Sequence, residues 1–280
     1  MWGLFPIYLR ALDAVPALQL VAHRVAWACI FVLGWMALRG ELAGFRAAFM
    51  RRGLLPRLAA TAILISINWL VFVWAVANDR VVETSLGYFI NPLVNVVLGV
   101  ALLSERLNRA QWISVALATI GVIYLTVSAG HLPWIALALA FSFGLYGFIR
   151  KTAQVDALPG LAVETALLAP LAMGYLLWAA ADGQGAMGHN GVAIDLLLIA
   201  SGAITAIPLF LFAYGARRLR YSTVGILQYL APTLQLATAV LIFGEPFDGA
   251  RATGFAFIWI ALLVYAGDGL VRARMIAKPG

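Results

Sequence analysis

Three ionisable side chains of this 280-residue chain fall inside long apolar segments, where they are best placed to do chemistry. His23, Arg24 and Glu164 each stand a little more than one helical turn inside such a segment. A charged group in a membrane-spanning helix is costly and usually faces a cavity or a partner, and an imidazole titrates near neutral pH. The three residues are therefore candidates for proton coupling or gating. Alternatively, Arg24 and Glu164 extend to the lipid headgroups at opposite faces, too far apart in depth to pair.

A second set of polar groups has helical spacing. Tyr88, Asn91 and Asn95 follow an i, i+3, i+7 pattern, so they share one helix face. Gln228 and Gln235 repeat the outer two positions 140 residues later. We interpret both sets as the lining of a substrate pathway. Alternatively, the amides join helices to one another, which is a common use of amides in membranes.

Aromatic residues offer a stacking surface close to this pathway. Asn68, Trp69 and Trp74 lie in one apolar segment, and their rings would suit an aromatic or amphipathic solute. Tryptophan is also common where a helix meets the membrane surface, which is the alternative explanation.

Sequence motifs of catalysis are missing. The chain has no GxSxG, no HExxH, no Walker loop and no acidic pair at metal-ligand spacing. Its one cysteine, Cys29, excludes an internal disulfide or a multi-cysteine metal site. We therefore expect neither an enzyme nor a bound metal or cofactor.

Composition places the chain in a membrane. Hydrophobic residues make up 64% and charged residues 11%, against roughly 45–50% and about 25% in soluble domains. A span needs about 20 apolar residues, and Met1–Leu9 is too short to cross alone. We predict an all-α polytopic protein whose nine full spans are Leu18–Leu38, Leu55–Ala77, Ser85–Leu103, Gln111–Val127, Pro133–Ile149, Gly160–Ala180, Ile194–Ala213, Ser222–Phe243 and Gly249–Ala266.

Basic residues predict the orientation of these spans. Of the 19 Lys and Arg residues, fifteen fall on one side of the predicted membrane, three on the other and Arg24 within a span. Cytoplasmic loops carry the excess of positive charge, so both termini are expected in the cytoplasm and 181–195 outside. The basic runs are thus orientation signals, and nucleic acid is not an expected partner.

The second half of the chain repeats the first at a nearly constant offset. Tyr88–Pro92 (YFINP) matches Gln228–Pro232 (QYLAP), and Glu105 and Glu245 each follow thirteen residues after the proline, where they would cap helix ends. We predict two five-helix repeats, 1–130 and 131–280. Because five is odd, the second repeat enters the membrane inverted, an arrangement that many secondary transporters use.

The offset also predicts that the first helix is incomplete. Upstream it becomes 141, which aligns Met1 with Ser142 and leaves 133–141 without a counterpart in the first repeat. On this pattern we expect the natural reading frame to begin upstream, or this chain to be a shortened form.

Several of these residues resemble a known family. The stretch Ser85-Leu-Gly-Tyr-Phe-Ile-Asn-Pro-Leu-Val-Asn95, with Leu103-Ser-Glu-Arg106, is similar to the fourth helix of the EamA branch of drug/metabolite transporters. The motifs at 22–27 (AHRVAW), 68–69 (NW), 72–75 (FVWA) and 140–143 (AFSF) resemble RarD-type, chloramphenicol-sensitivity permeases. The resemblance implies ten helices in two halves, a bacterial inner-membrane location and both termini in the cytoplasm.

These observations predict a secondary transporter that moves a small metabolite or drug-like solute outward by alternating access. Its partners would be the lipid bilayer and the solute, with a homodimer left open. The segments 85–103 and 222–243 are expected to face each other across a central cavity, with Tyr88, Asn91 and Asn95 on one wall and the two glutamines opposite. A non-transporting membrane scaffold is the alternative, and a flux assay separates the two.

Overall fold

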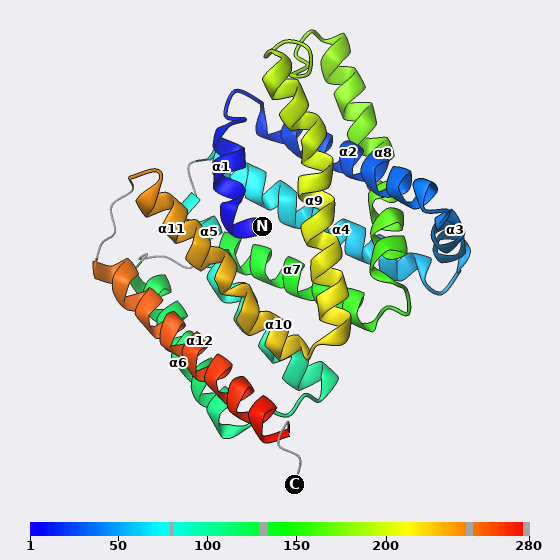
Figure 1. The fold of residues 1–280 in the computed structure, drawn as a ribbon. Helices are drawn as coiled ribbons and strands as arrows, with labels where there is room; N and C mark the ends of the chain where they lie inside the picture. Colours follow the sequence, from blue (N-terminus) through cyan, green and yellow to red (C-terminus); the bar gives the residue numbers. More distant parts are fainter. Residues whose placement is uncertain (79–80, 129–133, 245–248, 277–280) are drawn as a thin grey trace.

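The computed structural model describes residues 1–78, 81–128, 134–244 and 249–276, and within these ranges the regular structure is entirely helical (Figure 1). The elements in chain order are η1 (Trp2–Leu4), α1 (Phe5–Arg10), α2 (Ala17–Leu38), α3 (Leu42–Met50), α4 (Leu55–Ala77), α5 (Val81–Leu103), α6 (Arg109–Ser128), α7 (Trp134–Thr152), α8 (Ala157–Ala181), α9 (Val192–Arg218), α10 (Tyr221–Gln228), α11 (Leu230–Leu241) and α12 (Gly249–Ile276).

The predicted spans are confirmed as helices. Among the described residues, nine helical segments are long and apolar enough to cross a membrane, and each matches one predicted span to within a few residues. The short first segment forms η1 and α1, which together are too short to cross alone. One helix was missed: α3 lies in the connection after α2, where apolar residues at helical spacing surround Arg46.

The predicted span Ser222–Phe243 is not one continuous helix. It is divided at Tyr229 into α10 and α11, and the Tyr229 N–H bonds the Ile226 carbonyl at 3.1 Å in a tightened turn. Pro232 explains the break, because it has no N–H to donate to the carbonyl four residues earlier, at Gln228. Pro92, at the matching position of α5, lies inside a helix that continues through it.

The helices α6 and α12 pack against each other in opposite directions (Figure 1). Asn108, just before α6, donates to the Asp268 carboxylate at 2.6 Å, and Ser114 donates to the Ala261 carbonyl at 2.6 Å. Further along, Gly121 meets Gly254 so closely that a Cβ at 121 would lie 2.8 Å from the Gly254 carbonyl oxygen. Residue numbers therefore rise along one helix as they fall along the other, and small residues permit the close contact.

The helices α5 and α10 also run antiparallel. Beyond the end of α5, the Glu105 carboxylate accepts hydrogen bonds from the backbone N–H groups of Tyr221 (2.5 Å) and Ser222 (2.9 Å). A carboxylate at a helix N-terminus satisfies free N–H groups and suits the helix dipole. The prediction that Glu105 caps a helix end is confirmed, and the helix is α10 in the second half. Glu245 lies outside the described residues.

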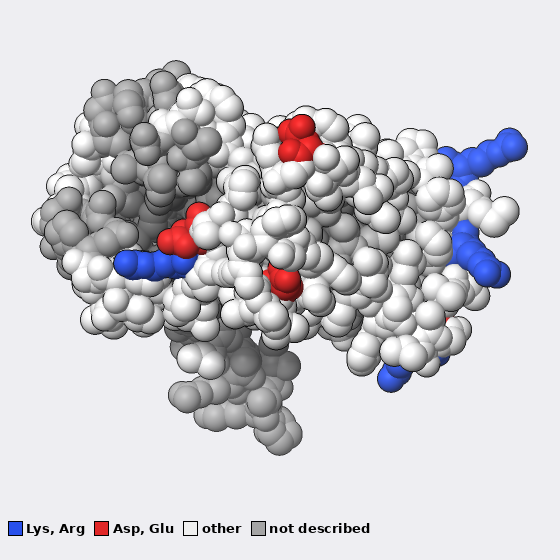
Figure 2. Space-filling view, turned by 90° about the horizontal axis from the view of Figure 1, so that it is seen from above, with Lys and Arg blue, Asp and Glu red and all other residues white. Residues whose placement is uncertain are grey.

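The surface seen in Figure 2 is mostly free of charged side chains, with Lys and Arg gathered mainly toward one end. Large apolar side chains are exposed over many helices, among them Trp35, Leu171, Leu177 and Leu263. Such an exterior suits lipid and not water. Arg150, one of the fifteen basic residues counted on the cytoplasmic side, is fully buried, and it pairs with an acid described below.

Candidate functional site

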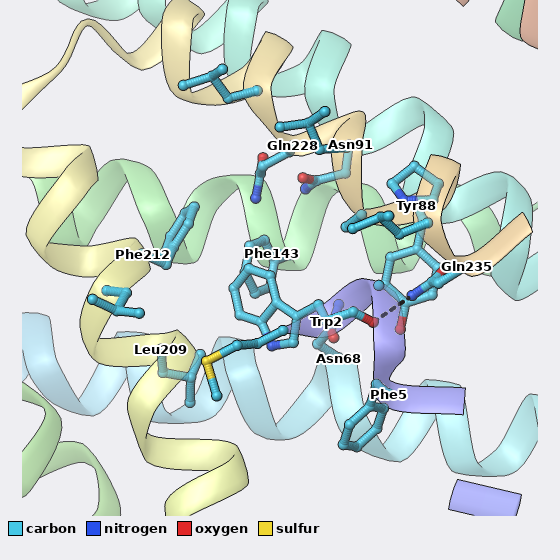
Figure 3. A pocket seen from close by; sticks show the side chains of 18 of the residues that line it. Trp2, Phe5, Asn68, Tyr88, Asn91, Phe143, Leu209, Phe212, Gln228 and Gln235 are labelled. Carbon is cyan, nitrogen blue, oxygen red and sulfur yellow. Dashed lines mark hydrogen bonds between the residues drawn. The ribbon is translucent and has the colours of Figure 1, made fainter. Parts of the chain in front are cut away.

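A cavity of about 500 Å³ lies between the two halves of the chain (Figure 3). Its volume is in the range of small-molecule sites. Both halves contribute to its wall, through η1, α2, α4 and α5 on one side of the sequence and α7, α9, α10 and α11 on the other. The predicted site residues that line it are Arg24, Asn68, Trp69, Tyr88, Asn91, Gln228 and Gln235.

Aromatic rings form one apolar part of the cavity wall. Trp2 meets Phe143 edge to face with ring centroids 5.5 Å apart, and Phe212 lies 5.9 Å from Trp2 and 5.0 Å from Phe143. The three rings come from η1, α7 and α9, so the cluster joins three elements that are distant in sequence (Figure 3). Such a wall offers stacking contacts to a flat or apolar solute.

Two amides of the cavity also tie helices together. Asn68 on α4 donates to the Leu139 carbonyl at 2.9 Å and to the Ser142 hydroxyl at 3.0 Å, both on α7. Asn91 on α5 donates to the Ala140 carbonyl at 3.0 Å, also on α7. Both asparagines therefore link helices and line the cavity, and for Asn91 these are the two interpretations that the sequence left open.

Asn95 lies behind the cavity and not on its surface. It is fully buried, and its amide donates to the Gln228 side-chain oxygen and, at 3.4 Å, to the Asn91 side-chain oxygen. Gln228 and Asn91 consequently lie close together (Figure 3). The expectation that these groups occupy opposite walls is wrong, because α5 and α10 are packed directly on each other.

Gln235 and Tyr88 also line the cavity. The Gln235 amide donates to the backbone carbonyl of Trp2 at 3.2 Å, which holds η1 against α11 (Figure 3). Tyr88 packs its ring against Phe72, with centroids 6.4 Å apart, and remains 40% exposed where it faces the cavity.

Arg24 points into the cavity and not toward the membrane surface. Its Nε donates to the Thr205 hydroxyl on α9 at 3.0 Å. Its guanidinium carbon lies 4.8 Å from the ring centre of Phe5 and 5.0 Å from that of Trp69, positions that suit cation–π contacts. The alternative in which Arg24 extends to the headgroups is therefore wrong.

Glu164 does not reach the headgroups either. Its carboxylate is almost fully buried, accepts a hydrogen bond from Thr61 at 2.6 Å and lies 3.5 Å from Arg150 Nε. Tyr146 donates to its other oxygen at 3.4 Å. The pair is separate from the cavity lining, and the expectation that Arg24 and Glu164 do not pair with each other is confirmed.

Two predicted residues are placed elsewhere. His23 is buried on α2 and does not line the cavity. Trp74 packs against Trp134 with ring centroids 5.5 Å apart, near the ends of α4 and α7. In the described part of the chain no group of three His, Cys, Asp or Glu residues could hold a metal ion.

The sequence reasoning missed the aromatic cluster, Thr205 and Arg150. Trp2, Phe143 and Phe212 lie in apolar segments where an inward ring and a lipid-facing ring have the same sequence signal. Arg150 stands beside Lys151 at a helix end, which is typical of a cytoplasmic loop charge.

The fold and the site define the class of this protein: it is a multi-pass helical membrane protein with a central cavity between its two halves. Residues 1–127 match the EamA-like transporter family. An uncharacterized transporter of Pseudomonas aeruginosa is 45% identical over 100% of this chain and 94% of its own length. Proteins named RarD from Escherichia coli and Streptomyces exfoliatus are 42% and 44% identical, over 99% and 98% of this chain and 94% and 87% of theirs.

A solved crystal structure, 22% identical, has a TM-score of 0.71 over 94% of this chain and 92% of that one, which shows a shared fold. The chain belongs to the EamA-like transporter family, with close relatives named RarD, and it is a membrane transporter.

Proposed function

We infer that this chain is a secondary transporter that exports a small metabolite or drug-like solute across the bacterial inner membrane by alternating access. The observation that carries the proposal is the central cavity, whose wall is built from both halves of the chain. A solute held there would contact η1, α2, α4 and α5 together with α7, α9, α10 and α11. Small relative movements of these helices would then change which side of the membrane it meets.

The packing of the helices supports an inverted-repeat mechanism. At the repeat offset α6 corresponds to α12 and α5 to α10 with α11, and each helix packs antiparallel on its counterpart. Pairs of this kind are what a two-fold axis in the membrane plane produces. Pro232 interrupts the α10–α11 span beside the cavity, where a break permits bending.

The substrate is found first and then tested directly. Metabolite levels in the medium and cytoplasm of deletion and overexpressing cells are compared, and an exporter should deplete its substrate inside overexpressing cells. The purified protein is then placed in proteoliposomes loaded with that solute, with and without a proton gradient. Efflux above protein-free vesicles supports the proposal. A scaffold protein would give no efflux, and efflux unchanged by the gradient would refute proton coupling.

A further inference from the structure

Arg24 brings a positively charged side chain into the cavity. Among the side chains of the described residues that line the cavity it is the one cation, and no carboxylate is present. Glu164, the buried acid of α8, is already paired with Arg150. In the described part of the chain Arg24 has no ion pair, and a guanidinium in a protein remains protonated.

The contacts of Arg24 leave its outer nitrogens free for a ligand. Nε donates to Thr205, and in the described part of the chain the guanidinium otherwise contacts the rings of Phe5 and Trp69. The two rings and the Thr205 hydroxyl hold the guanidinium in place, which reduces the entropy lost when a ligand binds. Two terminal guanidinium nitrogens match the two oxygens of a carboxylate.

The remaining wall indicates the body of the ligand. The cluster of Trp2, Phe143 and Phe212 supplies ring faces and edges. Gln228 accepts from Asn95 through its side-chain oxygen, so its NH₂ group is left to donate into the cavity (Figure 3). One cationic side chain, aromatic walls and an amide donor together fit a small molecule with one negative charge and an apolar body.

We propose that the cavity selects monoanionic solutes with an aromatic or apolar body, and that Arg24 binds their carboxylate. The inference rests on the proposed function, because it assigns the class of substrate to the same cavity. A phosphate dianion would bring two charges to the one cationic side chain of the described lining, which favours a carboxylate. The opposing explanation is that Arg24 only joins α2 to α9 through Thr205.

Binding measured without transport tests this proposal. The purified protein in detergent is titrated calorimetrically with 3-phenylpropionate, its neutral amide 3-phenylpropanamide, the cation 3-phenylpropylamine and the dianion phenyl phosphate. The carboxylate should bind about tenfold or more tightly than the amide, a difference of about 1.4 kcal/mol. Equal affinity for the two, no binding of the carboxylate, or tighter binding of the amine or the phosphate overturns the proposal.

Three variants locate the charge responsible. Arg24→Gln should lose the preference for the carboxylate while still binding the amide, and Arg24→Lys should keep part of it. Arg217→Gln removes the same charge from an exposed pair with Asp156, 2.7 Å apart, and should leave the preference intact. Gel filtration and amide binding show whether the Arg24→Gln protein is folded. If the folded variant still prefers the carboxylate, the assignment to Arg24 is refuted.

The proposed function can fail or stand separately. Efflux of a neutral solute in proteoliposomes, together with equal binding of acid and amide, would refute the anion site and leave the transporter. Binding of the carboxylate through Arg24 with no efflux of any solute would support the anion site and refute transport.

Discussion

The Asn95 amide donates to the side-chain oxygen of Gln228 and so joins α5 of the first half to α10 of the second, directly behind the cavity. Gly144 and Gly225 make room for it, since a Cβ at either position would lie 3.2 Å or less from an Asn95 atom. The same asparagine reaches Asn91 on its own helix. A buried link of this kind holds two cavity-lining amides, Asn91 and Gln228, in register.

Asn95→Leu should therefore act mainly on stability. It removes a buried hydrogen-bond donor from a tightly packed position, and we expect the free energy of unfolding to fall by about 1–3 kcal/mol. Thermal unfolding in detergent measures the change. Gln235→Leu is the matched comparison on the cavity wall, and it should reduce efflux with a smaller shift of Tm. Equal shifts of Tm in the two variants would contradict this division of roles.

Two glycines of α8 provide a test of the buried ion pair. A Cβ at Gly160 would lie 1.8 Å from Arg150 Nη1, whereas a Cβ at Gly174 would have no atom within 4 Å. Gly160→Ala should move the guanidinium away from Glu164. A buried charge that loses its partner costs about 3–5 kcal/mol.

Gly174→Ala should leave stability unchanged or slightly raised, because alanine is the better helix former. The two variants are compared by thermal unfolding under identical detergent conditions. Unfolding temperatures that differ by less than about 2 °C would show that Arg150 can move without loss, against this prediction.

The orientation of the chain is tested with single cysteines. Cys29 is buried and is replaced by Ala, after which His189→Cys places a thiol in the exposed 182–191 connection and Arg52→Cys another between α3 and α4. The positive-inside distribution predicts that an impermeant maleimide labels position 189 in intact cells and position 52 only after lysis. The reverse labelling pattern would refute the predicted topology.

The sequence predicts those features of the fold that depend on local properties of the chain. Span length and apolar composition are local properties, so α4 was predicted at its observed bounds, Leu55–Ala77. The break at Tyr229 was not predicted, because Pro232 and Pro92 give the same signal and only one of them interrupts its helix.

The site was harder to predict, because it depends on which way each side chain faces. Arg24 and Asn91 were identified by the cost of polar groups in lipid, which any inward position relieves. That cost does not distinguish a cavity from a buried contact, so Asn95 was assigned to the cavity although it lies outside its lining. Trp74, which was assigned as a stacking surface, also lies outside the lining. The ring of Phe143 carries no such cost and gave no signal.

The last prediction concerns the break between α10 and α11. Pro232 denies the Gln228 carbonyl its helical partner, and both residues line the cavity. Pro232→Ala supplies the missing N–H, so α10 and α11 should fuse into one helix. Because proline inside a helix costs about 3 kcal/mol, the variant should be as stable as the parent or more so.

If the break is the hinge of alternating access, that gain in stability should come with slower efflux in proteoliposomes while binding in the cavity persists. Pro56→Ala is the control, because Pro56 lies in the first turn of α4, where proline is tolerated, and its loss should change neither stability nor rate. Efflux of Pro232→Ala at the parent rate, with the protein folded and inserted, would show that movement does not depend on this break. A lower Tm would instead show that the interrupted form is the better-packed one, because fusing the two helices would then have moved Gln228 away from Asn95.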